Sequence, residues 1–138
     1  MKVSGSYPLT IPQKRAYDLL QDPEVLARCI PGCESLEQIA PGEYAMKMKM
    51  ALAAISGRFE GKITITDPQP PTQFRLNIEG SGKIGWVKGG GVLTLSEGVQ
   101  YHGDVQVGGT IAGVGQRLID TTAKMLIKRF FDKLNEVS

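Results

Sequence analysis

The sequence has few of the side chains that metal and redox sites usually require. Its 138 residues include two cysteines, Cys29 and Cys33, and one histidine, His102. A closed zinc site needs four ligands, and two cysteines are too few for an ordinary iron–sulfur cluster. We therefore predict no metal site and no bound cofactor. The two thiols are interpreted as ordinary unpaired groups near the Pro31-Gly32 turn, with redox chemistry as the alternative.

A strong excess of one charge is also missing, as is a long apolar segment. Lysine and arginine number 16 against 14 acidic residues, a net charge of +2, which argues against duplex nucleic acid as the main partner. The longest apolar run, Met50–Ile55, is far shorter than the roughly 20 residues that cross a bilayer. Met1–Gly5 does not lead into the apolar region of a signal peptide. We expect a soluble, cytoplasmic protein without an anchor after Ser138, and peripheral membrane contact stays open.

Alternation of apolar and polar residues is what the sequence has in abundance. It predicts strands over residues 2–10, 44–50, 58–66, 74–79, 85–95 and 100–107. In the second of these, Met46, Met48 and Met50 share one face while Lys47 and Lys49 share the other. One apolar face and one polar face are typical of an antiparallel sheet that packs on one side and meets water on the other.

Helices are predicted at both ends of this run of strands. A short helix spans Pro12–Leu20, and Asp22-Pro23-Glu24 starts a second one that ends before Pro31-Gly32. Residues 111–137 predict one long helix, because apolar residues recur there every three or four positions from Gly115 to Val137. We therefore expect an α+β chain with the order strand, two short helices, five strands, one long helix.

A sheet with one apolar face and a long helix with one apolar stripe have to cover each other. The covered interior is either a packed core or an apolar cavity with a few polar groups, and the alternation by itself leaves both open. Four glycines fall on the predicted inner face. They either open space there or let the sheet coil, and they are Gly61, Gly89, Gly91 and Gly103.

Motifs that would indicate catalysis or nucleotide binding are weak. Residues Gly80–Gly85 match G-x-G-x-x-G, but a strand and not a helix follows them, so no helix N-terminus is present to hold a pyrophosphate. His102 falls on the predicted polar face of its strand, away from any cleft. Ile127 and Phe131 lie at the edge of the helix stripe beside lysines, where they contact either the sheet margin or a partner.

Several motifs together resemble the CoxG family, which is named after a subunit of carbon monoxide dehydrogenase. They are the segment from Asp22-Pro23-Glu24 to Cys33-Glu34, the Gly57–Gly61 segment, the glycine string from Glu79 to Gly89, the run Val107–Ile119 and the pair Phe130-Phe131. The resemblance covers nearly the whole chain. It implies a single START-like domain over residues 1–138, with the helix-grip fold of the SRPBCC superfamily. In that fold a curved antiparallel sheet wraps a long C-terminal helix around an apolar cavity.

The same resemblance implies an accessory role beside a carbon monoxide dehydrogenase-type molybdenum hydroxylase. We expect a non-enzymatic protein that binds a hydrophobic small molecule, lipid-like or quinone-like. The residues expected to line the cavity are Met46, Met48, Met50, Phe59, Ile63, Leu76, Tyr101, Val105, Leu118, Ile119 and Thr122, with Ile30 and Pro31 at its lip. Tyr44, Tyr101 and Thr122 are candidates for orienting hydrogen bonds.

Two other functions stay open at this point. An assembly or membrane-recruitment factor would act through its surface and would be favoured by a dry interior and an exposed Ile127–Phe131 ridge. A cyclase-like or hydrolase-like START enzyme would need acid–base groups pointing into the cavity, for example an acid or histidine facing Tyr101.

Overall fold

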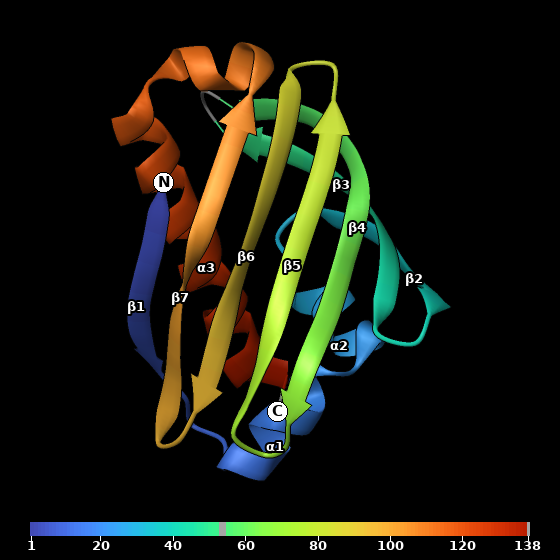
Figure 1. Ribbon diagram of the computed structural model, residues 1–138, viewed down its shortest axis with the longest axis vertical. Helices are drawn as coiled ribbons and strands as arrows, with labels where there is room; N and C mark the ends of the chain where they lie inside the picture. Colours follow the sequence, from blue (N-terminus) through green and yellow to red (C-terminus); the bar gives the residue numbers. More distant parts are fainter. Residues whose placement is uncertain (53–54, 138) are drawn as a thin grey trace.

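The computed structural model describes residues 1–52 and 55–137, so Ala53 and Ala54 of the apolar run lie outside the described residues. Seven strands form one antiparallel sheet with the order β1-β7-β6-β5-β4-β3-β2 (Figure 1). The strands are β1 (Lys2–Pro8), β2 (Cys33–Ala40), β3 (Glu43–Leu52), β4 (Ile55–Gln69), β5 (Gln73–Gly82), β6 (Gly85–Leu95) and β7 (Gly98–Gly108). The helices are α1 (Gln13–Leu20), α2 (Pro23–Cys29), the 3-10 helix η1 (Gly109–Val114) and α3 (Gln116–Val137).

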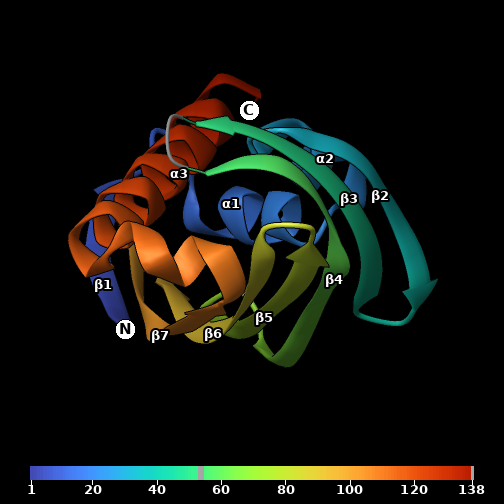
Figure 2. The same ribbon diagram turned by 90° about the horizontal axis from the view of Figure 1, so that it is seen from above.

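The sheet is curved and its helices lie on one side of it. Seen from above, the strands wrap around α1 and α2, and α3 crosses the open side of the curve (Figure 2). This arrangement of two short helices after β1 and a long helix at the C-terminus confirms the predicted helix-grip architecture. The face that meets the helices is called the concave face below, and the opposite face is called the outer face.

The start of α2 follows its sequence closely. The Asp22 carboxylate accepts a hydrogen bond from the Glu24 amide at 2.9 Å, and Pro23 is the first helical residue. Both residues suit a helix start, because the side chain satisfies a free amide and proline has no amide to satisfy. The predicted short helices at residues 12–20 and from residue 23 onward are therefore confirmed.

Strand β2 is absent from the order that the sequence predicts, which has five strands after the short helices instead of six. Its pairing with β3 shifts register twice, between Cys33 and Ser35 and again between Gln38 and Ala40. Each shift inserts an unpaired residue and reverses which side of the strand the next side chain occupies. The alternation that reveals the other strands is therefore absent from Cys33–Ala40.

The predicted long helix over residues 111–137 was wrong at its start. Residues Gly109–Val114 form the 3-10 helix η1, and Gly115 has a φ of 99°, which no α-helix contains. The α-helix begins at Gln116. Gly115 fits the spacing of the apolar stripe, but a residue with positive φ separates two helical segments.

The C-terminal half of α3 is fastened to β1 and to the segment that follows it. The Tyr7 hydroxyl donates to Asp132, and the Asn135 side chain accepts from the Thr10 amide at 2.9 Å and donates to the Pro8 carbonyl at 3.3 Å. The Phe131 ring stacks on Tyr7 with centroids 5.6 Å apart. We call this set of contacts the β1 clasp.

The β1 clasp predicts a pH dependence of stability. Hydrogen bonds from Lys128 and then from Tyr7 hold the pKa of the Asp132 carboxyl below its usual range. The unfolded chain therefore takes up this proton at a higher pH than the folded chain. The stabilisation is complete above the ordinary aspartate pKa of about 3.9 and is lost as the pH falls through the lower folded value.

Urea unfolding at pH 6 and at pH 3 measures this effect. We expect Asp132→Asn to lose less stability than the wild type between the two pH values. Asp120→Asn is the matched control, because Asp120 pairs with Lys124 on the same helix at 3.1 Å and is not part of the clasp. Equal pH dependence in Asp132→Asn and the wild type would contradict the role given to Asp132.

Candidate functional site

The buried apolar residues of the concave face form three separate clusters. The helix cluster lies where α1, α2 and the end of α3 meet the sheet, and consists of Ala16, Tyr17, Leu19, Leu20, Val25, Cys29, Phe74, Leu93, Leu95, Val99, Phe131 and Leu134. The methionine cluster is built on Tyr44, Met46 and Ile63. The η1 cluster is built on Ile55, Phe59 and Ile111. Half-buried residues connect the clusters: Ile65 and Leu76 pack against both the helix cluster and the methionine cluster, and Met48 packs against both the methionine cluster and the η1 cluster.

Apolar side chains at the centre of the sheet are incompletely buried, although Ile78 also borders a hollow on the outer face. Ile78 lies directly opposite the buried Ile63, and opposed residues point to the same face, yet Ile78 is 37% exposed. Leu76 and Val105 are half-buried on neighbouring strands of the same face. A sheet sealed by its helix would bury these side chains, as it does at the ends.

Paired glycines on adjacent strands bend the sheet at this centre. A Cβ on Gly61 would collide with the Glu79 carbonyl and lie 2.6 Å from the Cα of its partner Gly80. A Cβ on Gly103 would lie 2.7 Å from the Cα of its partner Gly91. Their neighbours are backbone atoms of the next strand, so these glycines permit close approach and coiling. Of the two readings that the sequence left open, the structure favours coiling at these pairs.

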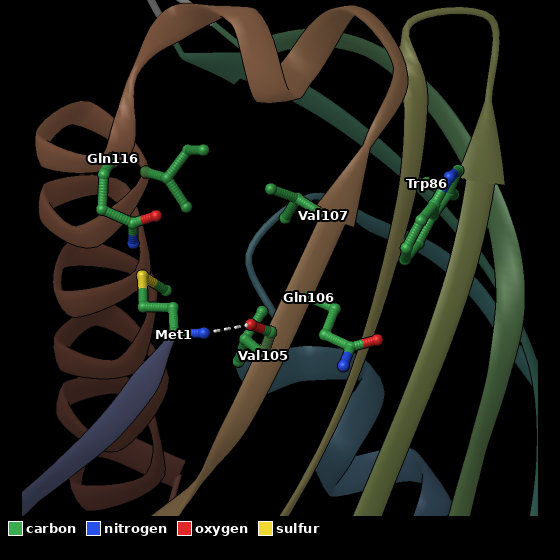
Figure 3. Close-up of a pocket in the computed structure, with 7 residues that line it drawn as sticks. Met1, Trp86, Val105, Gln106, Val107 and Gln116 are labelled. Carbon is green, nitrogen blue, oxygen red and sulfur yellow. Dashed lines mark hydrogen bonds between the residues drawn. The ribbon is translucent and has the colours of Figure 1, made fainter.

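A hollow of about 350 Å³ opens between β7 and the first turns of α3 (Figure 3). We call it the β7–α3 hollow. Strand β1 pairs with β7 as far as Asp104, and beyond that point α3 stands opposite the upper part of β7. The residues that line it are Met1, Trp86, Val105, Gln106, Val107, Gln116 and Ile119. Its volume lies within the range of sites that hold small molecules, roughly 300–1,000 Å³.

The predicted lining residues are distributed over this interior. Val105 and Ile119 line the β7–α3 hollow. Met46, Met48, Ile63, Leu76 and Ile30 belong to or pack against the methionine cluster, Met50 and Phe59 belong to the η1 cluster or pack against it, and Tyr101 packs against the helix cluster. Thr122 is buried, Pro31 is half-buried and Leu118 is 39% exposed beside Ile119. Ligand contact by these residues stays a prediction.

Polar side chains are scarce in the interior. Among the residues that the structure describes, Thr122 is buried, and the other buried residues are apolar or, like Tyr17 and Tyr44, largely apolar with a terminal hydroxyl. The Tyr101 ring stacks on Phe131 with centroids 6.2 Å apart, and its hydroxyl lies over Gly5 of β1. His102 is exposed on the outer face. The buried side chains therefore offer mostly apolar surface, with the hydroxyls of Thr122, Tyr17 and Tyr44 as polar groups.

The two thiols differ in their surroundings but share a low reactivity. Burial raises the pKa of Cys29, which lies in the helix cluster, and of Cys33, whose thiol also donates to the Ser35 carbonyl at 3.5 Å. A raised pKa keeps a thiol protonated and poorly nucleophilic. Within the described part of the chain, no three side chains drawn from histidine, cysteine, aspartate and glutamate converge.

The apolar edge of α3 does not form an exposed ridge. Phe131 is buried between Tyr7 and Tyr101, and Ile127 is half-buried against the helix cluster. Of the two readings for this edge, the structure favours packing against the sheet margin. The exposed Ile127–Phe131 ridge, which would have favoured an assembly or membrane-recruitment factor, is therefore not present.

A second hollow, of about 450 Å³, lies on the outer face over Gly90. Arg75 and Asn77 lean over this glycine, and the Arg75 Nε donates to the Asn77 Oδ1 at 3.3 Å. The rim carries both signs of charge, with Lys62, Lys88, Glu79 and Asp104. It lies in a solvent-facing sheet and has charged side chains at its rim, whereas the side chains that line the β7–α3 hollow are a mixture of apolar residues and the uncharged polar residues Gln106 and Gln116.

The sequence did not indicate Met1, Val107 or Gln116 as part of the site. Val107 follows the alternation of its strand and could have been included with Val105. Met1 and Gln116 carry no such signal, because their positions depend on how far β1 covers β7 and where α3 begins. The Met1 ammonium donates to the Val105 carbonyl at 2.9 Å, which places it at the rim (Figure 3).

A curved antiparallel sheet, closed by a C-terminal helix around a partly open apolar interior, defines a protein of the helix-grip class. The chain belongs to the CoxG family, the G subunits of carbon monoxide dehydrogenase, whose sequence model matches residues 5–137. This confirms the resemblance seen in the sequence motifs. No curated protein matches the chain.

Solved structures repeat the same fold. A conserved protein from Geobacillus kaustophilus is 33% identical, with a TM-score of 0.96 over 99% of this chain and 93% of that one. A protein from Thermus thermophilus is 17% identical, with a TM-score of 0.67 over 99% and 95% of the two chains. Ara h 8.0201 is 13% identical, with a TM-score of 0.65 over 99% and 96%. The last two similarities show the fold alone.

A bilayer crossing requires a helix that is both long and strongly apolar. Within residues 1–52 and 55–137, none of the helices has that combination.

Proposed function

We propose that this protein binds an uncharged, hydrophobic small molecule and serves as a non-enzymatic accessory of a carbon monoxide dehydrogenase-type oxidoreductase. The observation that carries the proposal is the half-exposed apolar centre of the concave face, together with the β7–α3 hollow that opens beside it. A lipid-like or quinone-like molecule suits this surface, because burying its apolar area gains roughly 25 cal/mol per Å² before the cost of association.

The scarcity of interior charge supports an uncharged ligand. Moving an ionised group into an apolar site without a partner is costly, and the buried residues of the described part of the chain include no acidic or basic side chain. A ligand with a long apolar part and few hydrogen-bonding groups fits that inventory. Membership of the CoxG family supports the accessory role, and a cytoplasmic location, at times at the membrane surface, belongs to the same proposal.

Uptake of an uncharged fluorescent probe tests the proposal. Met48 packs against both the methionine cluster and the η1 cluster, so a change there alters the middle of the interior. We expect N-phenyl-1-naphthylamine to bind the wild type and to bind Met48→Asp about tenfold more weakly, because the carboxylate resists burial. Fluorescence titration gives both dissociation constants.

Met48→Leu is the matched control, because leucine conserves volume and apolar character. We expect it to bind the probe as the wild type does. Equal binding by a folded Met48→Asp would contradict the assignment of this interior to ligand binding. A wild type that does not take up the probe would contradict the proposed function itself.

A further inference from the structure

Sulfur-containing side chains occupy the concave face where β2 pairs with β3. Met46, Met48 and Met50 alternate along β3 and therefore point to the same side. The register places Cys33 of β2 directly opposite Met48, and directly opposed residues have Cβ atoms about 4.5–5.5 Å apart. One thiol and two thioether side chains, Cys33, Met46 and Met48, therefore belong to or pack against the same cluster.

Few donor atoms other than sulfur are present in this part of the interior. Met46 is buried, and Cys33 and Met48 pack against the same methionine cluster, whose other members are Tyr44, Ile63 and aliphatic neighbours. These members include no carboxylate and no imidazole. Sulfur therefore dominates the available donors, apart from the Tyr44 hydroxyl and the backbone.

Sulfur donors distinguish strongly between metal ions. Thiolates and thioethers are soft ligands that select Cu(I), whereas Mg²⁺ and Ca²⁺ prefer oxygen, and a structural Zn²⁺ site takes four thiolate, imidazole or carboxylate ligands. Two cysteines and one histidine are too few for zinc, but thioethers add donors that only a soft ion uses. Three sulfur donors in an apolar place meet the requirement of Cu(I).

We propose that Cys33, Met46 and Met48 form a binding site for one Cu(I) ion. On binding, the Cys33 sulfur forms a bond to copper and releases its proton to solvent, and the thioethers donate lone pairs without losing a proton. Copper stays Cu(I), so the step needs no oxidant or reductant. The Cys33 thiol gives up its hydrogen bond to the Ser35 carbonyl in the process.

Methionine also fills irregular apolar space, and substitutions that conserve volume separate the two roles. Met48→Leu and Met46→Leu keep the apolar packing and remove one sulfur each, and Cys33→Ser removes the thiol. Met125→Leu changes a methionine on α3, and Cys29→Ala changes the thiol of the helix cluster. The last two are controls outside the site.

Anaerobic competition with bathocuproine disulfonate, followed by the absorbance of its Cu(I) complex, measures the affinity. We expect the wild type and both controls to withdraw one equivalent of copper from the chelator. Met48→Leu and Met46→Leu should each bind at least about tenfold more weakly, and Cys33→Ser should not compete. X-ray absorption of the loaded protein should show sulfur neighbours around copper.

The proposal fails if the wild type withdraws no copper. It also fails if Cys33→Ser and Met48→Leu bind copper as tightly as the controls do. A third contrary result would be binding of more than one equivalent of copper, with the same affinity in the site variants as in the controls. Probe uptake keeps this test separate from the proposed function, because Cys33→Ser should lose copper and keep N-phenyl-1-naphthylamine. If Met46→Leu or Met48→Leu binds copper as the wild type does, the three-sulfur site is wrong.

Discussion

Gly61→Ala is expected to destabilise the protein by about 3 kcal/mol, an effect at the upper end for added volume in a packed region. The new methyl group would collide with the Glu79 carbonyl and lie 2.6 Å from the Gly80 Cα. Both atoms belong to the β5 backbone, which cannot withdraw without breaking its pairing with β4. Urea unfolding monitored by circular dichroism measures the loss.

Gly80→Ala is the matched control, because Gly80 is the cross-strand partner of Gly61. A Cβ at Gly80 would meet the Glu60 carbonyl at 3.6 Å, which is ordinary contact. We expect its stability to lie within about 1 kcal/mol of the wild type, since alanine also restricts the unfolded chain. Equal stabilities of the two variants would show that β4 and β5 do not approach as closely as described.

Val105→Trp is expected to weaken N-phenyl-1-naphthylamine binding by about tenfold or more, because the indole would occupy the β7–α3 hollow. Val105 is half-buried on the concave face, so the larger ring can extend into existing space. The unfolding midpoint should change much less than binding does. Fluorescence titration and thermal unfolding of the same preparation measure the two quantities.

His102→Trp provides the comparison for this prediction. His102 lies on the same strand but on the outer face, where it is exposed. The substitution adds the same indole without reaching the hollow, and we expect wild-type binding. If Val105→Trp binds the probe as tightly as His102→Trp does, the β7–α3 hollow is not the binding site or its entrance.

Gly61 and Val105 belong to different parts of one arrangement. The glycine pairs bend the sheet so that its concave face curves around the helices, and the β1 clasp fastens the C-terminal half of α3. The N-terminal half of α3 follows η1 and Gly115, and the hollow lies beside it. The opening is therefore located where α3 is joined to the sheet by a turn, away from the clasp.

Local pattern was sufficient for most of the fold. Alternation predicted five of the six strands after the short helices, because each side chain along them keeps its face. The Asp22-Pro23 start of α2 was predictable, because capping depends on neighbours in the chain. Strand β2 was missed because its two register shifts break the alternation. The boundary at Gly115 was missed because its spacing fits the stripe that its φ interrupts.

The β7–α3 hollow and the Cys33–Met48 pairing could not be predicted from local patterns. Alternation assigned Val105 to the concave face and periodicity assigned Ile119 to the inner stripe of the helix, but neither pattern contains the distance between the two. Leu118 was included with Ile119 and is exposed, since one residue along a helix is a rotation of about 100°. The pairing of Cys33 with Met48 follows a register that the β2 bulges set.

Local patterns in the chain were enough to predict the inward face of most strands, the two short helices, the antiparallel sheet and the family. These follow from periodicity, capping and motifs, which act over a few neighbouring residues. The tertiary structure decided how strongly the sheet bends, where α3 stands relative to β7 and that Cys33 pairs with Met48. Those features depend on contacts between segments far apart in the chain, such as Gly61 with Gly80 and Tyr7 with Asp132, and no local pattern encodes such contacts.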